Sequence, residues 1–196
     1  MSGVPISAKP LTAAGVRLEP LEPRHREGLR QAADAADIWA YMPISAAGDG
    51  FERWFDFSVS MAETQKEAVW AVRSLDEGRL VGSTRYMVLE PRHRRVEIGH
   101  TWYHPSVWGG RVNPACKYLL MGYGFEELDL IRMELKTDAR NTRSQAAIAK
   151  LGATREGVLR HHYILADGYR RDSVYFSVLA AEWPQVRAGL EARLAL

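Results

Sequence analysis

The chain has 196 residues, of which 46% are hydrophobic and 26% are charged, as is usual for a globular protein with its own core. The formal net charge of +2 does not by itself indicate a nucleic-acid partner. The single cysteine, Cys116, excludes an internal disulfide, and no run of 18 apolar residues could form a membrane span. We therefore expect a cytoplasmic protein.

The first part of the chain predicts an arm, a strand and two helices. Residues 1–14 are rich in Ser, Pro and Ala and are predicted to form a flexible N-terminal arm before a single domain over 15–196. Apolar and polar residues alternate over 16–21, which predicts a strand. Pro23 is typical of a first helical turn and predicts a helix to about Ala36, and a second helix is expected over 51–63.

The middle of the chain predicts an antiparallel meander, because three strand-like runs are separated only by short turns. The later pattern alternates between helices and strands, which together with the meander gives an α+β fold. The predicted meander strands are 68–73, 80–89 and 96–103, followed by a helix from Pro114 to about Leu128, a strand over 131–137, a helix over 142–151, strands over 154–165 and 169–179 joined by a turn at 166–168, and a helix over 182–194.

Residues 108–114, Trp-Gly-Gly-Arg-Val-Asn-Pro, lie between a predicted strand and a predicted helix. Asn113 is a good N-cap and Pro114 suits the first helical position, so the free N–H groups of that helix would form an anion site beside Arg111. The alternative is a plain loop before a well-capped helix. A Walker loop is excluded because its Lys-Ser/Thr ending is absent, and a Rossmann motif because the preceding strand belongs to the meander.

A second junction of the same kind follows at residues 138–152. Asn141 is predicted to cap the helix, and Ser144 lies in its first turn, where its hydroxyl could instead bond local backbone. Two successive junctions place two helix N-termini near one end of the sheet, with room between them for a long, partly anionic ligand. The basic residues of 131–160 suit the same ligand, although they could also form an ordinary solvated surface.

These motifs resemble the GNAT superfamily of GCN5-related N-acetyltransferases, and in particular its RimJ/RimL group of ribosomal-protein N-terminal acetyltransferases. The resemblance covers about Val16 to Leu179 and is carried by residues 97–102, 108–113, 141–144, 146–148, 151–153, 156–160 and 167–172. It implies a mixed, mostly antiparallel twisted sheet, flanked by helices and splayed in the middle to hold acetyl-CoA. The chain departs from the superfamily's Gln/Arg-x-x-Gly-x-Gly/Ala turn, whose three defined positions are here Trp108, Arg111 and Asn113.

The resemblance also implies roles for individual residues. Ser144 matches a hydroxyl that protonates the leaving thiolate, and Asn141 would touch the pantetheine arm. Pantetheine would pair with the backbone around Trp102 and Tyr103. The pyrophosphate would meet the backbone amides of Gly109, Gly110, Arg111, Val112 and Asn113.

The base that deprotonates the acceptor amine is expected on the strand at 96–103. Glu97 could act through a water molecule, or it could form an ion pair with Arg85, Arg94 or Arg95. His100 is a rival base. Because the two differ by an odd spacing, they face opposite sides of a regular strand unless a bulge intervenes.

The predicted function is transfer of an acetyl group from acetyl-CoA to a primary amine by direct attack in a ternary complex. The acceptor could be a protein N-terminus or a small amine such as an antibiotic, a polyamine or an amino acid, with specificity on the loops at 37–50 and 161–172. No metal is expected because the histidines lack ligand spacing, no membrane or nucleic-acid partner is expected, and a homodimer is implied by resemblance only. The alternatives are an acyl-CoA sensor without turnover and a nucleic-acid binder that uses the basic 131–160 surface.

Overall fold

The computed structural model describes residues 6–165 and 167–196. Residues 1–5 of the predicted arm and residue 166 of the predicted turn lie outside this part. The helices are α1 (Arg26–Ala33), α2 (Gly50–Glu63), α3 (Val112–Gly122), α4 (Thr142–Ala149) and α5 (Trp183–Leu194). The strands are β1 (Leu11–Ala13), β2 (Val16–Pro20), β3 (Ala68–Ser74), β4 (Arg79–Glu90), β5 (Arg95–Tyr103), β6 (Arg132–Asp138), β7 (Thr154–Ile164) and β8 (Arg170–Leu179).

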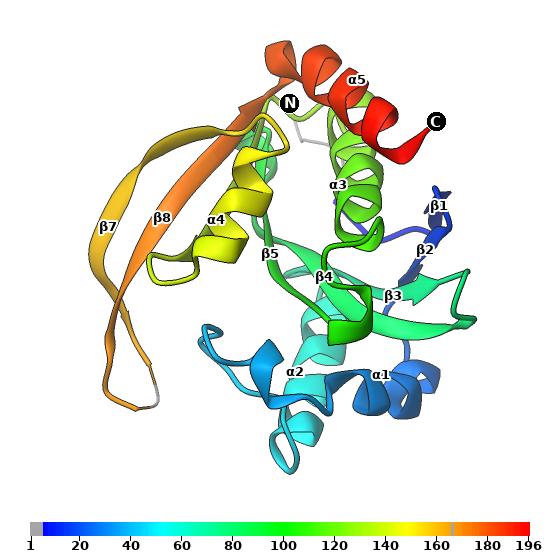
Figure 1. Cartoon of the computed structure of the whole chain (residues 1–196), viewed down its shortest axis with the longest axis vertical. Coiled ribbons are helices and arrows are strands. Elements are labelled where there is room, and N and C mark those ends of the chain that lie inside the picture. The colour runs from blue at the N-terminus through cyan, green and yellow to red at the C-terminus, as the bar shows by residue number, and fades with distance from the viewer. Residues whose placement is uncertain (1–5, 166) are drawn as a thin grey trace.

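The described strands form one sheet in the order β1-β2-β3-β4-β5-β6-β8-β7. The strand pairs are antiparallel except for β5 and β6, which run parallel in the middle (Figure 1). This arrangement confirms the predicted mixed, mostly antiparallel sheet flanked by helices.

The sheet is covered on both faces, and β3 shows why its sequence is almost continuously apolar. Successive side chains of a strand point to opposite faces. Trp70 and Val72 accordingly join a core with residues of α3 and α5, whereas Val69 and Ala71 join a second core with α1 and α2. The two faces of β3 are therefore buried in different cores, and Figure 1 shows α1 and α2 on one side of the sheet and α3, with α5 packed against it, on the other.

The described part of the predicted N-terminal arm is ordered by contacts far along the chain, so the prediction of a flexible arm is wrong for these residues. Leu11–Ala13 pairs with β2 as strand β1. Ile6 is 6% exposed and belongs to the larger core, and the Trp70 indole Nε1 donates to the Lys9 carbonyl at 2.7 Å. Non-local pairing and burial therefore fix a segment whose composition is typical of a loose arm.

The sheet opens between β5 and β6, as the resemblance implied. These strands pair only through Arg95–Glu97 and Arg132–Glu134, and beyond these residues they separate. Each strand continues to pair with its outer neighbour, β5 with β4 as far as Tyr103 and β6 with β8 as far as Asp138. The inner edges of β5 and β6 therefore face a gap. None of the helices in the described ranges has the length and apolar character to cross a bilayer.

Candidate active site

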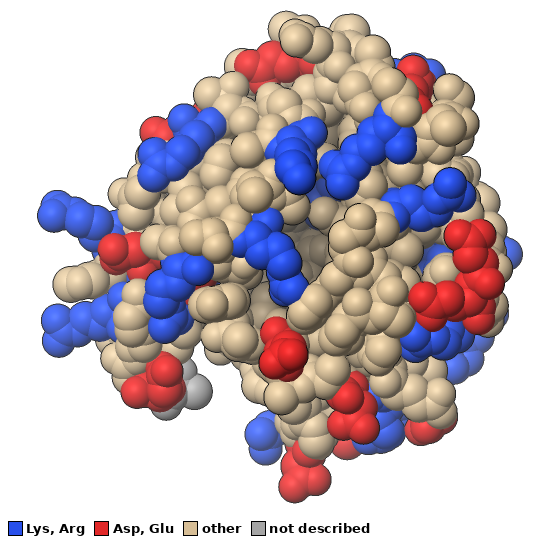
Figure 2. Space-filling view, viewed as in Figure 1, with Lys and Arg blue, Asp and Glu red and all other residues tan. Residues whose placement is uncertain are grey.

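A cavity of about 520 Å³ occupies the opening between β5 and β6, within the roughly 300–1,000 Å³ of typical ligand pockets. Its walls come from β5, β6, the starts of α3 and α4, the loop at 37–44, and the β7–β8 hairpin. Figure 2 shows Lys and Arg side chains around a hollow on this face of the molecule. The cavity thus joins the two strand-to-helix junctions to both loops that were predicted to carry acceptor specificity.

A bulge in β5 brings Glu97 and His100 to the same cavity. Ser83 pairs with Trp102 and Arg85 with Gly99, so two steps along β4 match three along β5. His100 has a φ of 44°, in the left-handed region, as expected where a strand carries an extra residue. The alternation of a regular strand is broken here, and both Glu97 and His100 line the cavity.

Glu97 is buried, with 2% of its surface exposed, and its Oε2 accepts a hydrogen bond from Lys136 Nζ at 2.7 Å. Burial raises the pKa of Glu97, while the nearby Lys136 ammonium opposes this rise. The sequence suggested an ion pair between Glu97 and an arginine as the alternative. This prediction is wrong, because the partner of Glu97 is Lys136. The three arginines proposed for that pair contact other carboxylates, Arg85 with Glu67, Arg94 with Asp129, and Arg95 with Glu134 and Glu90.

His100 is held neutral at physiological pH. Burial lowers its pKa to about 4, and the positive charges of Arg85, Lys136 and Arg171 act in the same direction. A neutral imidazole can accept a proton, but a group with such a low pKa is a weak base at pH 7.

The helix after the glycine turn begins earlier than predicted. Val112 is its first residue, Arg111 occupies the N-cap without a side-chain cap hydrogen bond, and Asn113 lies inside the first turn. The prediction of Asn113 as the cap is therefore wrong. Val112 is buried in the larger core, which fixes the helix start, and Pro114 is tolerated because first-turn N–H groups have no intrahelical partner.

The turn itself contributes two of its predicted residues to the cavity. Gly109 and Asn113 line it, whereas Gly110, Arg111 and Val112 are not among its lining residues. Gly109 has a φ of 75°, a conformation that disfavours side chains with a Cβ. Glycine is therefore favoured at position 109. Because Gly109 has no side chain, its backbone is left uncovered beside the cavity.

Trp102 and Tyr103 form a fixed wall of the cavity. The Trp102 ring lies 5.3 Å from the ring of Trp39 and 5.3 Å from that of Trp54, in the second core. The Tyr103 carbonyl accepts a hydrogen bond from the Trp108 indole at 2.8 Å, so this carbonyl already has a partner. The wall is thus held by aromatic packing on one side and by the turn on the other.

The start of α4 matches the prediction closely. The Asn141 side chain is the N-cap and accepts a hydrogen bond from the Ser144 backbone N–H at 2.9 Å. Both residues line the cavity. Within residues 6–165 and 167–196, the Ser144 hydroxyl makes no hydrogen bond to local backbone, so it is available to a ligand.

The cavity also contains cationic residues whose individual roles were not predicted. The Arg143 guanidinium lies 3.6 Å from the centre of the Trp108 ring and so links the two junctions. Lys117 of α3 is buried, burial lowers its pKa to about 8, and its Nζ donates to Thr101 Oγ1 at 3.4 Å. The basic run at 131–160 included Arg143 and Lys136, but nothing local in the sequence indicates that Lys117 or Arg171 faces a cavity.

In the described ranges, no group of three or more His, Cys, Asp or Glu side chains is arranged to hold a metal ion.

Comparisons with known proteins agree with this architecture. The model of the Acetyltransferase (GNAT) domain matches residues 16–154. The chain is 30% identical to YdaF of Bacillus subtilis (strain 168), provisionally named a ribosomal N-acetyltransferase, over 67% of this chain and 79% of that protein. It is 26% identical to the spermidine N(1)-acetyltransferase of Escherichia coli (strain K12), over 81% and 83% of the two chains.

The crystal structure of a GCN5-related N-acetyltransferase from Brucella melitensis superposes with a TM-score of 0.89 at 27% identity, covering 97% of this chain and 87% of that one. The splayed sheet, the cavity at its opening and the matched family model lead to one conclusion. The chain belongs to the GNAT acetyltransferase family and is an acetyl-CoA-dependent acetyltransferase.

Proposed function

We propose that this enzyme transfers the acetyl group of acetyl-CoA to a primary amine, by direct attack within a ternary complex, and that a protein N-terminus is the favoured acceptor. The observation that carries this proposal is the continuity of the cavity. The same space is lined by both helix starts, by the loop at 37–44, and by Tyr163 of β7 and Arg171 of β8. A donor at one end and an acceptor at the other would meet between β5 and β6.

The donor end suits a long ligand with phosphate groups. The N-terminus of α3 offers free backbone N–H groups and a favourable dipole, and the Arg143 guanidinium lies beside it on Trp108. We infer that the pyrophosphate is held at Gly109 to Asn113 and that Asn141 and the backbone at Trp102 and Tyr103 hold the pantetheine arm. Of these five residues, Gly109 and Asn113 line the cavity, whereas Gly110, Arg111 and Val112 do not.

Two groups are proposed to move protons. Glu97 would accept the proton of the acceptor ammonium through a water molecule, because its raised pKa makes it a stronger base than an ordinary carboxylate. His100, with a pKa of about 4, is the weaker candidate. Ser144 would donate its hydroxyl proton to the leaving thiolate sulfur, because Ser144 lines the cavity at the start of α4.

A protein N-terminus fits the acceptor end better than a polyamine, the substrate named for the Escherichia coli relative. Tyr41, Ile44 and Tyr163 line this end and could contact neighbouring peptide residues. Arg171 lines the cavity as well, and its charge would repel an acceptor carrying several ammonium groups.

The two alternative functions are less well supported. The family and its named relatives are N-acetyltransferases, which favours turnover over sensing. A nucleic-acid surface at 131–160 is weakened by internal ion pairs: Arg132 contacts Glu134 and Glu156, and Arg140 contacts Asp138. Such charges are less available to phosphates than free ones. A homodimer and a cytoplasmic location stay predictions.

The decisive experiment is an acetyl-CoA thiol-release assay against peptides with free N-termini and small amines, including spermidine. We expect release with at least one peptide and its loss in S144A and E97Q. Acetyl-CoA binding without release would favour a sensor. No release together with no binding would refute the proposed function.

A further inference from the structure

Arg171 of β8 is a buried cation whose charge is poorly compensated. It is 4% exposed and lines the cavity. Among the described residues its guanidinium makes no hydrogen bond, and the buried Nε has no partner. The nearest carboxylate, Asp138, is 3.9 Å from Nε and is already bound by the Arg140 guanidinium at 2.9 Å. An unsatisfied buried charge is costly, which indicates a role in binding a ligand.

The other cationic side chains of the cavity either have a carboxylate partner or lie at the donor end. Lys136 is neutralised by Glu97 at 2.7 Å. Arg143 and Lys117 lie on α4 and α3, the helices of the donor end. The charged residues that line the cavity, apart from histidine, are Lys117, Lys136, Arg143 and Arg171 against Asp37 and Glu97. Away from the donor end, Lys136 and Arg171 are matched in number by Asp37 and Glu97, but among the described residues Arg171 is not in contact with either carboxylate, whereas Lys136 is paired with Glu97.

Arg171 lies close to the proposed site of proton removal. Its Cζ is 5.7 Å from the centre of the Tyr163 ring, and Lys136 Nζ is 5.4 Å from the same centre. Lys136 in turn contacts Glu97 directly. An anion at Arg171 would thus be a near neighbour of an amine that loses its proton towards Glu97.

We propose that Arg171 binds a carboxylate of the acceptor, close to the amine that is acetylated. This inference rests on the proposed function and narrows its substrate class. The chemistry has two sources, the α-carboxylate of an amino acid and an acidic side chain near the N-terminus of a peptide. A guanidinium suits either, because its planar fork can donate two parallel hydrogen bonds to one carboxylate.

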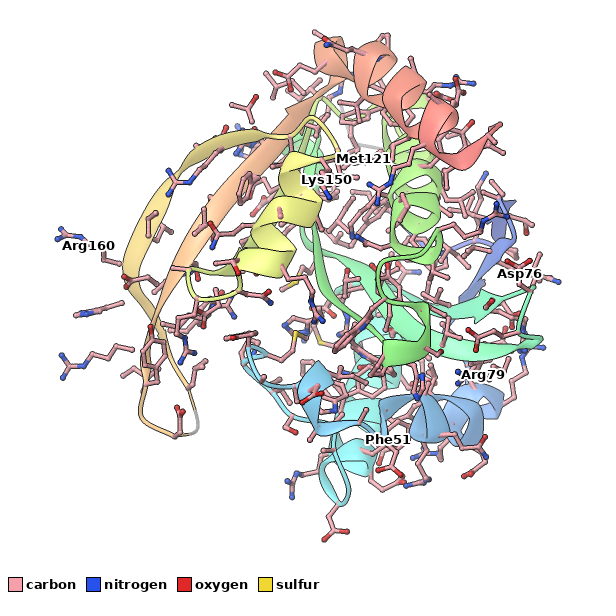
Figure 3. All side chains as sticks on the ribbon, in the orientation of Figure 1. Phe51, Asp76, Arg79, Met121, Lys150 and Arg160 are labelled. Carbon is pink, nitrogen blue, oxygen red and sulfur yellow. The ribbon has the colours of Figure 1, made fainter. Side chains whose placement is uncertain are left out.

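The test uses pairs of acceptors that differ only in this charge. One pair is a free amino acid and its carboxamide, and the other is a peptide with Asp at the second position and the same peptide with Asn. The variants are R171M, which removes the charge, and R171K, which keeps it without the fork. R160M is the control, because Arg160 is exposed on β7 and points away from the body of the protein (Figure 3).

We expect the wild type to prefer the carboxylate member of one pair by roughly 10- to 100-fold in kcat/KM, as for hydrogen bonds to a charged group. The pair that shows the preference identifies the source of the carboxylate. R171M should abolish the preference, R171K should retain part of it, and R160M should behave as wild type. The KM for acetyl-CoA should be unchanged in all three variants, and thermal melting should show that they are folded.

Equal rates within both pairs, or an R171M variant whose defect is in the KM for acetyl-CoA, would overturn the inference. If none of the acceptors is turned over, calorimetric binding of the same pairs to the CoA-loaded protein decides it. Stronger binding of one carboxylate member, lost in R171M, supports the inference even though the proposed transfer would then have failed. Equal binding within both pairs rejects it.

Discussion

Replacing Lys136 by Met removes the cation that holds Glu97 in its ionised form. The carboxylate is 2% exposed, and its ion pair with Lys136 Nζ is 2.7 Å long. Removing one partner of a buried pair costs about 3–5 kcal/mol, because the remaining charge has neither water nor counter-ion. We therefore expect K136M to lose about that much free energy of unfolding at pH 7.5.

The loss should depend on pH in a defined direction. Burial already raises the pKa of Glu97 in the folded protein against the opposing effect of Lys136, so K136M raises this pKa further. A carboxyl group with a raised folded pKa binds its proton more tightly in the native state than in the unfolded state. Its destabilising effect therefore develops as the pH rises from the ordinary glutamate range through the folded pKa, and it is absent below that window. The difference between K136M and wild type should shrink at acidic pH.

Urea unfolding at pH 7.5 and at pH 5, followed by tryptophan fluorescence, measures this effect. The double variant K136M/E97Q is the control, because a neutral amide in place of the carboxylate should recover most of the loss at pH 7.5. An equal loss at both pH values, or no recovery in the double variant, would show that Lys136 stabilises the fold by packing rather than by its charge.

The remaining predictions concern the donor end and the bulge. Ser144→Ala should lower kcat roughly 100-fold with little change in the KM for acetyl-CoA, measured by thiol release, because a general acid acts on the transition state. Arg143→Met should raise the KM for acetyl-CoA by roughly 10-fold and weaken its salt dependence in the same assay. Gly82→Ala would place a Cβ 2.1 Å from the Trp102 carbonyl oxygen, so thermal unfolding should show a free energy of unfolding lower by about 1–3 kcal/mol. Gly157→Ala is the control, because its Cβ would meet nothing within 4 Å, and its free energy of unfolding should stay within about 0.5 kcal/mol of wild type.

The parts of the site that depend on local sequence were predictable. Asn141 caps α4 through an atom of its own side chain to a backbone group three residues away, an interaction that the spacing alone indicates. The start of α3 was misplaced because a competing non-local force, burial of Val112 in the core, decided it. The same cause explains the arm, where Leu11–Ala13 is a strand only because β2 offers it a partner.

The bulge at His100 and the ion pair of Glu97 could not be read from the chain. The bulge is a mismatch of register with β4 and leaves no mark on the alternation of β5 itself. The partner of Glu97 depends on the parallel register in which Glu97 lies opposite Glu134, which brings Lys136 within reach. Both features depend on contacts between residues far apart in the sequence, so the local pattern does not indicate them, although they bring Glu97, His100 and Lys136 to the same cavity.

The positive charges near Glu97 would have opposite effects on the two stages of the proposed reaction. An acceptor amine arrives as an ammonium ion and is repelled by Arg171 as it enters, whereas the charge of Lys136 is offset by Glu97. Once it is bound, the same charges lower the pKa of the ammonium and favour the neutral amine that attacks the thioester. A carboxylate on the acceptor would offset the entry cost by binding Arg171, whereas Lys136 remains engaged with Glu97. A carboxylate bound to Arg171 would also reduce the effect of that charge on the pKa of the amine, so removal of the proton would then depend on Glu97.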